Sequence, residues 1–167
     1  VIAIDTDSLY ITVDDIIEKH ASDKEPIEWL DQFASDALEK VLEKTYGKYA
    51  EETNAYTNRM VMKREAIADR GIWTAKKRYI LNVHNNEGVQ YAQPKIKMMG
   101  IEAVKSSTPM VCREAMKKMF KLMMNANEKE TQDGIKLFKK HFTSLPPEEV
   151  SFPRSVSDVS KFANRST

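Results

Sequence analysis

The sequence of 167 residues predicts an α+β protein, with an antiparallel sheet, one long packing helix and a helical segment after the sheet. Three observations support this class. A helical apolar period runs through residues 27–49, strand-like runs separated by turn residues occupy 59–93, and helical periods return over 108–142. Helices and strands therefore fall in separate parts of the chain, as they do in α+β folds.

The first 13 residues predict a β-hairpin, because two β-rich arms flank the polar tip Asp5-Thr6-Asp7-Ser8. A tight turn keeps Asp5 and Asp7 close enough to share one divalent ion. Hard cations such as Mg²⁺ favour oxygen ligands of this kind. The alternative is a turn with two solvated aspartates, and the spacing alone favours that alternative because Asp-x-Asp is common.

A short helical turn over 14–20 and a long helix follow the hairpin. Pro26 suits the first turn of the long helix. Its apolar residues recur at steps of three and four, which predicts one continuous helix: Ile27, Leu30, Phe33, Ala34, Ala37, Leu38, Val41, Leu42, Tyr46 and Tyr49. Acidic residues occupy the other face, so most of the negative charge is expected on a solvated surface.

Residues 59–68 and 72–84 predict two strands of an antiparallel meander, with Asp69-Arg70-Gly71 as the turn between them. Residues 85–88 predict a second turn and 89–93 a third strand. Pro94 is expected to interrupt the meander.

A further helix is predicted to begin at Thr108, a good N-cap residue, with Pro109 as its first residue. Residues 130–142 predict another amphipathic helix, which Pro146-Pro147 ends, and the Ser-rich remainder has little periodicity. The expected buried stripe of the first of these helices is Val111, Cys112, Ala115, Met116, Met119, Phe120 and Met123.

The net charge of +1 hides a strong separation of charge along the chain. Residues 1–58 hold 5 basic and 14 acidic residues, whereas residues 59–121 hold 14 basic and 5 acidic ones. A polyanionic partner for the middle of the chain and a merely solvated charged face explain this equally well.

Other bulk features exclude several classes. The single cysteine, Cys112, excludes an internal disulfide and a cysteine metal cluster, and it fits a reducing compartment. No apolar run approaches the roughly 20 residues that cross a membrane, so no membrane partner is expected. The chain opens without Met inside a strand pattern, and we expect it to be a piece of a longer protein.

Three stretches, taken in order, resemble one known family. They are Asp5-Thr6-Asp7-Ser8, Lys77-Arg78-Tyr79 and GIEAVKSSTP at residues 100–109. The set resembles the C-terminal part of the palm and the start of the thumb of family B DNA polymerases, above all those of tailed phages. The resemblance covers about residues 1–145, including MKREAIA at 62–68. It implies that residues 1–100 are the C-terminal half of the palm and 101–167 an incomplete start of the thumb.

The resemblance also implies catalytic roles. Asp7 matches the aspartate that binds the catalytic Mg²⁺ ions, Asp5 matches its less constant neighbour, and Glu65 matches a carboxylate near that centre. Polymerases use two such ions to stabilise the attacking 3′ oxygen and the departing pyrophosphate. The implied substrates are deoxynucleoside triphosphates and primer-template DNA.

Duplex-binding roles are implied for a second set. A Lys-x-Tyr pair on a strand contacts the duplex near the primer end in the family, and the thumb-entry stretch touches the duplex as well. For Tyr79 the alternative is plain strand packing. The residues implied to bind DNA are Lys77, Arg78, Tyr79, Lys105, Ser106 and Ser107.

The sequence departs from the family in a few places. Ile4 stands where relatives have Gly, Ala3 where many have Tyr, and the turn at Asp69-Arg70-Gly71 is shorter than the loop of phage relatives. The second metal-binding aspartate, the fingers, the exonuclease domain and most of the thumb have no counterpart in these residues.

The implied function is therefore that of a fragment or subunit of a DNA-directed DNA polymerase, inactive alone and acting in the cytoplasm of an infected bacterium. The missing N-terminal portion of the polymerase is the implied protein partner. The alternative is a duplex-binding module without catalysis. A stand-alone Asp-x-Asp transferase explains neither Lys77-Arg78-Tyr79 nor the thumb-like stretch.

Overall fold

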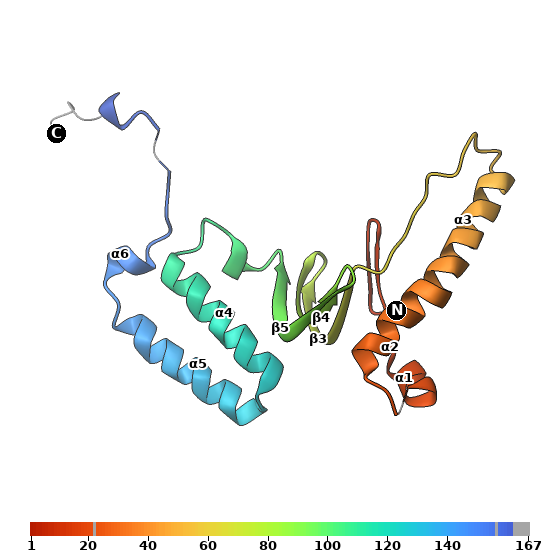
Figure 1. The fold of residues 1–167 in the computed structure, drawn as a ribbon. Coiled ribbons are helices and arrows are strands. Elements are labelled where there is room, and N and C mark those ends of the chain that lie inside the picture. The colour runs from red at the N-terminus through yellow and green to blue at the C-terminus, as the bar shows by residue number, and fades with distance from the viewer. Residues whose placement is uncertain (22, 156, 162–167) are drawn as a thin grey trace. The chain divides into compact units, whose positions relative to one another are not determined.

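The structure, a computed structural model, describes residues 1–21, 23–155 and 157–161 (Figure 1). The chain divides into two compact units. The first unit comprises Val1–Lys77 and Leu81–Lys97, and the second comprises Arg78–Ile80 and the chain from Met98 onward. Helices and antiparallel strands are both present, which confirms the predicted α+β class.

The chain opens with the predicted hairpin. Strand β1 (Ala3–Asp5) pairs with β2 (Ser8–Tyr10), and the loop is Thr6-Asp7, two residues rather than the four of the predicted tip. Thr6 takes a φ of +53°, which is uncommon for a β-branched residue. The antiparallel register pairs Ala3 with Tyr10, Ile4 with Leu9, and Asp5 with Ser8.

The predicted helices of the first unit are present, with one irregularity. Helix α1 spans Asp14–His20, α2 spans Pro26–Phe33 and α3 spans Glu39–Glu52. Between α2 and α3 lies a π-helix, Ala34–Leu38, so that the run is continuous in Figure 1 but not uniformly α-helical. A π-turn holds one extra residue.

The apolar face of this helical run is only partly buried. Leu30, Ala34 and Ala50 are buried, whereas Val41 and Tyr49, which the period places on the same face, are exposed. The packing face predicted from the spacing is therefore shorter than the helix.

A three-stranded sheet follows in the order β3-β4-β5, with β3 at Ala66–Ala75, β4 at Arg78–Asn86 and β5 at Val89–Met99. Two-residue turns join consecutive strands, so the sheet is an antiparallel meander as predicted. The central strand β4 is buried on both faces, and its buried residues are Tyr79, Ile80, Leu81, Asn82, Val83 and Asn85.

The predicted turn at Asp69-Arg70-Gly71 is wrong, because these residues lie inside β3. A Cβ at Gly71 would lie 2.6 Å from the ring of Trp73 and 2.8 Å from Leu81. Glycine stands there because neighbouring side chains occupy the space of a side chain, and not because the chain reverses.

The true turn lies at residues 76–77, where Lys77 has a φ of +61°. Lys77 is therefore a turn residue, which corrects its predicted place on a strand. The first strand also begins later than predicted, at Ala66, and residues 59–65 belong to no strand.

Pro94 does not interrupt the meander, since β5 runs through it. The prediction failed because β5 lies at one end of the strand order. Proline lacks the N–H of a ladder hydrogen bond, and an edge strand tolerates that loss.

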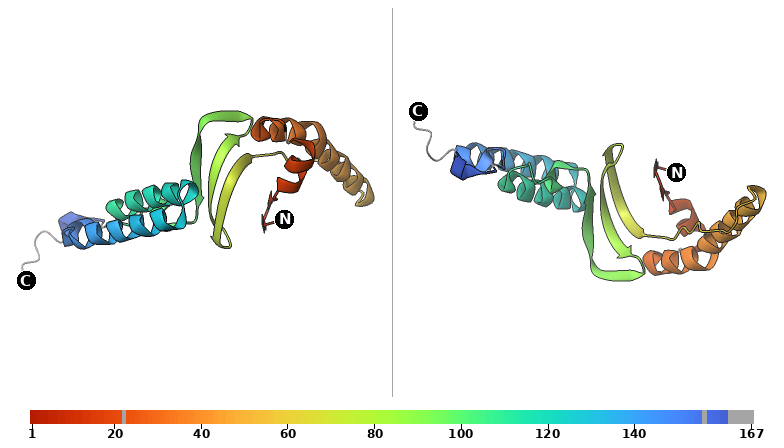
Figure 2. Two further views of the ribbon diagram at one scale, coloured as in Figure 1. Left: turned by 90° about the horizontal axis from the view of Figure 1, so that it is seen from below. Right: turned by 90° about the horizontal axis from the view of Figure 1, so that it is seen from above.

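The second unit is helical beyond the sheet. A 3₁₀ turn at Glu102–Val104 precedes α4 (Met110–Asn125), α5 (Glu128–Thr143), the short α6 (Pro147–Val150) and a 3₁₀ turn at Val159–Lys161. Helices α4 and α5 lie side by side in every view (Figures 1 and 2).

One local feature begins α5 and another allows it to pack closely on α4. Asn127 caps α5 by accepting a hydrogen bond of 3.0 Å from the Glu130 amide, and the Glu130 carboxylate accepts one of 3.2 Å from the Asn127 amide. Gly134 permits close contact, because a Cβ there would lie 2.7 Å from Leu122.

Details of α4 differ from the prediction. The helix begins at Met110, so Thr108 is not its cap, and the buried Thr108 donates its amide hydrogen to the Lys105 carbonyl instead. Met123, predicted to be buried, is exposed and Met124 is buried in its place. Pro147 begins α6 rather than only ending the preceding helix.

No helix among the described residues is both long enough and apolar enough to cross a lipid bilayer.

Replacing two glycines by alanine should change stability in opposite directions. Glu87 and Gly88 form the β4–β5 turn with φ of +51° and +83°, so Gly88→Ala should lower the free energy of unfolding by about 1 kcal/mol. Gly47 lies within α3 with nothing within 4 Å, so Gly47→Ala should raise it by about 0.5–1 kcal/mol. Urea unfolding measures both, and changes of the same sign would contradict this account.

Candidate functional site

The hairpin contacts strand β3 and the turn that follows it. The register places Asp5, Ser8 and Tyr10 on one hairpin face. The ring of Tyr10 meets Trp73 of β3 edge-on, with centroids 5.5 Å apart and planes at 72°. The Asp5 carboxylate lies 3.5 Å from the ammonium of Lys77, in the turn that follows β3. A predicted metal ligand and a predicted duplex-binding lysine are thus neighbours.

The two aspartates of the tip have different surroundings. Oδ1 of Asp5 faces the Lys77 ammonium and accepts a hydrogen bond of 3.2 Å from the Thr6 hydroxyl. The exposed Asp7 makes no hydrogen bond or ion pair within the described part of the chain. Asp5 is therefore positioned by its neighbours, while the carboxylate of Asp7 is open to a ligand.

The tip presents two carboxylates, which is fewer than a closed metal site needs. Within residues 1–21, 23–155 and 157–161, no three His, Cys, Asp or Glu side chains gather closely enough to hold an ion. Two carboxylates on one turn nevertheless suit Mg²⁺, which takes one or two protein carboxylates and completes its shell with water and phosphate oxygens. The donor set fits a magnesium ion whose other ligands come from elsewhere.

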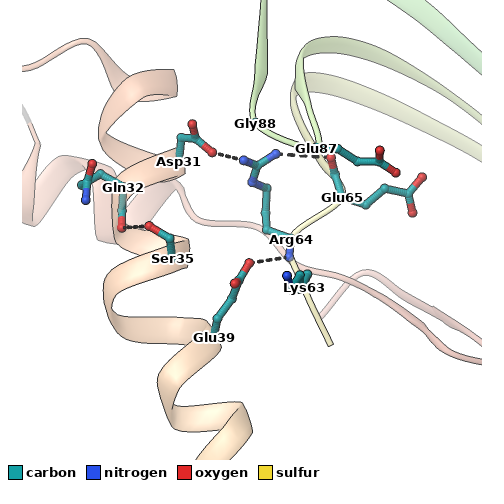
Figure 3. Close-up of a pocket in the computed structure, with 9 residues that line it drawn as sticks. All are labelled: Asp31, Gln32, Ser35, Glu39, Lys63, Arg64, Glu65, Glu87 and Gly88. Atoms are coloured by element: carbon teal, nitrogen blue, oxygen red, sulfur yellow. Dashed lines mark hydrogen bonds and ion pairs between the residues drawn. The ribbon is translucent and has the colours of Figure 1, made fainter. Parts of the chain in front are cut away.

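Glu65, the third predicted catalytic carboxylate, has a different setting. It forms an ion pair with Lys97 of β5, and its backbone carbonyl accepts a hydrogen bond from the Glu87 amide. It also lines a cavity of about 710 Å³ beside the helical run (Figure 3). The structure does not gather Asp5, Asp7 and Glu65 into one three-carboxylate group.

Arg64 dominates this cavity, and sequence reasoning missed it. Its guanidinium forms an ion pair with Asp31 of α2 and donates a hydrogen bond of 2.8 Å to Asn85 of β4. Its backbone amide donates to Glu39 at 2.9 Å. Figure 3 shows Arg64 reaching from the strand side toward the helix. The only signal in the sequence is a basic residue beside Glu65, which does not reveal partners so far along the chain.

The partial burial of Arg64 affects its pKa and its need for an acidic partner. Only 15% of its side chain is exposed, and desolvation lowers the pKa of Arg64 below its ordinary value. A guanidinium stays charged in proteins, so the cation requires the acidic partner that Asp31 provides.

Most of the other predicted duplex-binding residues lie in the second unit. Arg78 pairs with Glu102, which also accepts a hydrogen bond of 3.2 Å from Lys105. Ser106 and Ser107 are exposed in the segment before α4.

Tyr79 is only 6% exposed, so its burial agrees with the alternative of strand packing. Lys77, in the first unit, keeps 61% of its side chain exposed. The exposed members of the predicted set are therefore lysines and serines, and Arg78 keeps 39% of its side chain exposed.

Nearly the whole chain is similar to part of known proteins. The chain is 31% identical over 174 aligned residues to the DNA-directed DNA polymerase of Enterobacteria phage T4, with 96% of the chain covered. It is 36% identical over 171 residues to that of Escherichia phage RB69, with 95% covered. Each match takes in 19% of the relative, so the chain spans about a fifth of the length of these curated relatives. No model of a protein family matches the chain. The similarity confirms the resemblance to phage polymerases.

Removing the Arg64 guanidinium should destabilise the fold. Asp31 would lose its cationic partner, and Asn85 would lose a hydrogen-bond donor. We expect Arg64→Ala to lower the free energy of unfolding by about 2–4 kcal/mol. Arg64→Lys keeps the charge but not the planar fork and should recover only part of the loss. Arg59→Ala is the matched control, since Arg59 is exposed and without an ion pair in the described chain, and it should cost less than about 0.5 kcal/mol. Equal costs for Arg59 and Arg64 would contradict the network.

The Glu102 contacts predict a pH effect. Hydrogen bonds from its own backbone amide and from Lys105 hold the pKa of Glu102 below its usual value. A carboxyl with a lower pKa in the folded state stabilises the fold above its unfolded pKa, and this stabilisation is lost as the pH falls through the folded pKa. Lys105→Met should raise the pKa of Glu102, as read by carbon NMR of its carboxyl group.

Lys117→Met provides the control for that titration. Lys117 is the main cause of the lowered pKa of Glu114 and has no contact with Glu102. Lys117→Met should shift the pKa of Glu114 and leave that of Glu102 unchanged. A pKa of Glu102 that does not change with Lys105→Met would refute the role given to Lys105.

Proposed function

We propose, from the premise that this chain is a homologue of one segment of the phage DNA-directed DNA polymerases, that it supplies metal ligands and duplex contacts to such an enzyme. Two observations carry the proposal together: a match over 95% of the chain, and a hairpin with two aspartates at its tip. The reaction would be template-directed transfer of deoxynucleotides to a primer end.

We assign residues 1–100 to the C-terminal half of a palm and residues 101–167 to the start of a thumb. The division into two compact units supports this assignment, because the second unit takes up the chain from Met98 onward. The first unit would then carry the catalytic hairpin, and the helical hairpin of α4 and α5 would belong to the thumb.

Asp7 and Asp5 are the residues that would hold magnesium. The bound ion would supply charge stabilisation for the attacking and departing oxygens. The exposed carboxylate of Asp7 offers oxygens in any direction, whereas Thr6 and Lys77 fix the orientation of Asp5. Since Thr6 has a left-handed φ, the tip also carries backbone strain of the kind that accompanies functional sites.

The outer face of the hairpin supports a larger polymerase context. A two-stranded hairpin is marginally stable in water, and contiguous exposed apolar residues mark an interaction surface. The register places Ile4 opposite Leu9, away from the face that meets β3. We expect the missing remainder of the palm to cover the exposed Ile2, Ile4, Leu9 and Ile11.

Duplex contacts would come from the exposed basic residues of both units. Lys77 follows β3, and Lys105, Ser106 and Ser107 precede α4. Lysines and hydroxyls contact phosphate oxygens and so grip DNA without reading its sequence. The proposed partners are primer-template DNA, deoxynucleoside triphosphates and the rest of the polymerase, in the cytoplasm of an infected bacterium.

A duplex-binding module without catalysis is the second candidate. The observation in its favour is that the described residues contain no third carboxylate beside Asp5 and Asp7. Asp7→Ala separates the two candidates. A binding module keeps or gains DNA affinity, whereas a polymerase that contains the chain loses turnover and still binds DNA.

A chimeric polymerase tests the proposal directly. The 167 residues replace the aligned segment of the RB69 enzyme, and we expect Mg²⁺-dependent primer extension. Asp7→Asn in the chimera should lower kcat about a thousandfold with little change in primer-template affinity, because it removes a metal ligand. The matched control is Asp15→Asn in α1, which is exposed and should leave kcat unchanged.

The isolated chain gives the complementary result. It should extend no primer, because it presents only part of a metal site. Primer extension by the isolated chain would overturn the proposed role of the hairpin. A chimera whose kcat is unchanged by Asp7→Asn would overturn it as well.

A further inference from the structure

The contact between Asp5 and Lys77 joins two residues whose proposed ligands carry opposite charge. A carboxylate at the hairpin tip attracts a divalent cation, and an exposed lysine attracts a DNA phosphate. In the structure the two side chains satisfy each other instead, with Nζ of Lys77 3.5 Å from Oδ1 of Asp5. Neither ligand can bind fully without changing this pair.

We propose that Lys77 is the resting counter-ion of Asp5 and that metal binding at the hairpin and phosphate binding by Lys77 favour each other through it. The inference rests on the proposed function, since it takes Asp5 and Asp7 as metal ligands. It adds a coupling between metal and duplex that neither residue provides separately.

The position of Lys77 makes it suitable for this exchange. It lies in the two-residue turn after β3 with a φ of +61°, so that no strand pleat fixes its direction. Its side chain is 61% exposed, against 26% for Asp5. The lysine is the more exposed partner and has access to a ligand, whereas the aspartate is the more enclosed one.

Electrostatics gives the direction of the coupling. An ammonium within a few ångströms of Asp5 repels a divalent cation that approaches the same carboxylate. A DNA phosphate that engages Lys77 draws the ammonium away and restores the full negative charge of Asp5. Linkage then requires the reverse effect with the same factor, so a bound cation frees Lys77 for the duplex.

The chain contains its own controls. Asp7 shares the hairpin tip but has no cation partner among the described residues, so its substitution should not release Lys77. Lys76 shares the turn and is exposed, and no ion pair involving it occurs in the described chain. Substitutions at residues 76 and 77 therefore change the net charge equally, and only Lys77 touches Asp5.

The first arm of the test measures Mn²⁺ affinity of the whole chain by electron paramagnetic resonance, with and without a primer-template duplex. The native chain should bind Mn²⁺ about two- to five-fold more tightly when the duplex is present, the range expected of a half-exposed ion pair. Lys77→Met should bind Mn²⁺ more tightly without DNA and lose the effect of the duplex. Lys76→Met should keep that effect.

The second arm needs no metal. In EDTA, Asp5→Asn should raise duplex affinity because it releases Lys77, and Asp7→Asn removes the same charge from the same hairpin. We expect the gain from Asp5→Asn to exceed that from Asp7→Asn by about two- to five-fold. The excess should vanish when Lys77→Met is added to both variants.

The outcomes distinguish a failure of the coupling from a failure of the proposed function. Mn²⁺ binding that requires Asp7 but is indifferent to Lys77→Met overturns the coupling and leaves the proposed function intact. Two outcomes overturn the metal assignment: Mn²⁺ binding that Asp7→Asn leaves unchanged, and no Mn²⁺ binding by the native chain. Either one also overturns the proposed effect of metal binding on Lys77. Equal gains for Asp5→Asn and Asp7→Asn in EDTA overturn the role of Lys77 as counter-ion.

Discussion

The first unit depends on the interactions of the partly buried guanidinium of Arg64. It connects Asp31 of α2 to Asn85 of β4, while its backbone amide binds Glu39 at the start of α3. Because the residue stands two positions before β3, these bonds anchor the chain at the start of that strand. Strand β3 then carries Trp73 and leads into the turn of Lys77, and both residues contact the hairpin. The Arg64 cluster and these hairpin contacts therefore lie toward opposite ends of one strand.

Local patterns predicted the elements well because each is encoded by its neighbours in sequence. The hairpin follows from strand propensity, and the long helical run and α5 follow from their apolar periods. Errors arose where tertiary packing decided the outcome. The sequence predicts a turn at Gly71 because it does not show that Trp73 and Leu81 fill the side-chain space there. It predicts a break at Pro94 because the place of this residue on an edge strand depends on the strand order.

The candidate site shows the same division between local and distant information. The motif containing Asp5 and Asp7 points to these two residues as candidate metal ligands without any structure. That Asp5 meets Lys77, and that Arg64 bonds to residues 33 and 21 positions away, follows only from the folded chain. Tyr79 illustrates the opposite case, since its burial shows that a motif residue also serves as packing. Motifs report which side chains take part, whereas the contacts report which of them act on each other.

The open edge of the meander affects how the chain behaves at high concentration. An edge strand with free N–H and C=O groups is a template on which a second molecule adds its own strand. In β5 this row of donors is broken at Pro94. Lys95 and Lys97 follow it and place positive charge on either side of Ile96. The Lys95 ammonium is held 4.0 Å from the centre of the Tyr91 ring, which keeps charge along the strand. Two copies brought edge to edge would meet a missing hydrogen bond and like charges, so β5 resists self-association into a continuous intermolecular sheet.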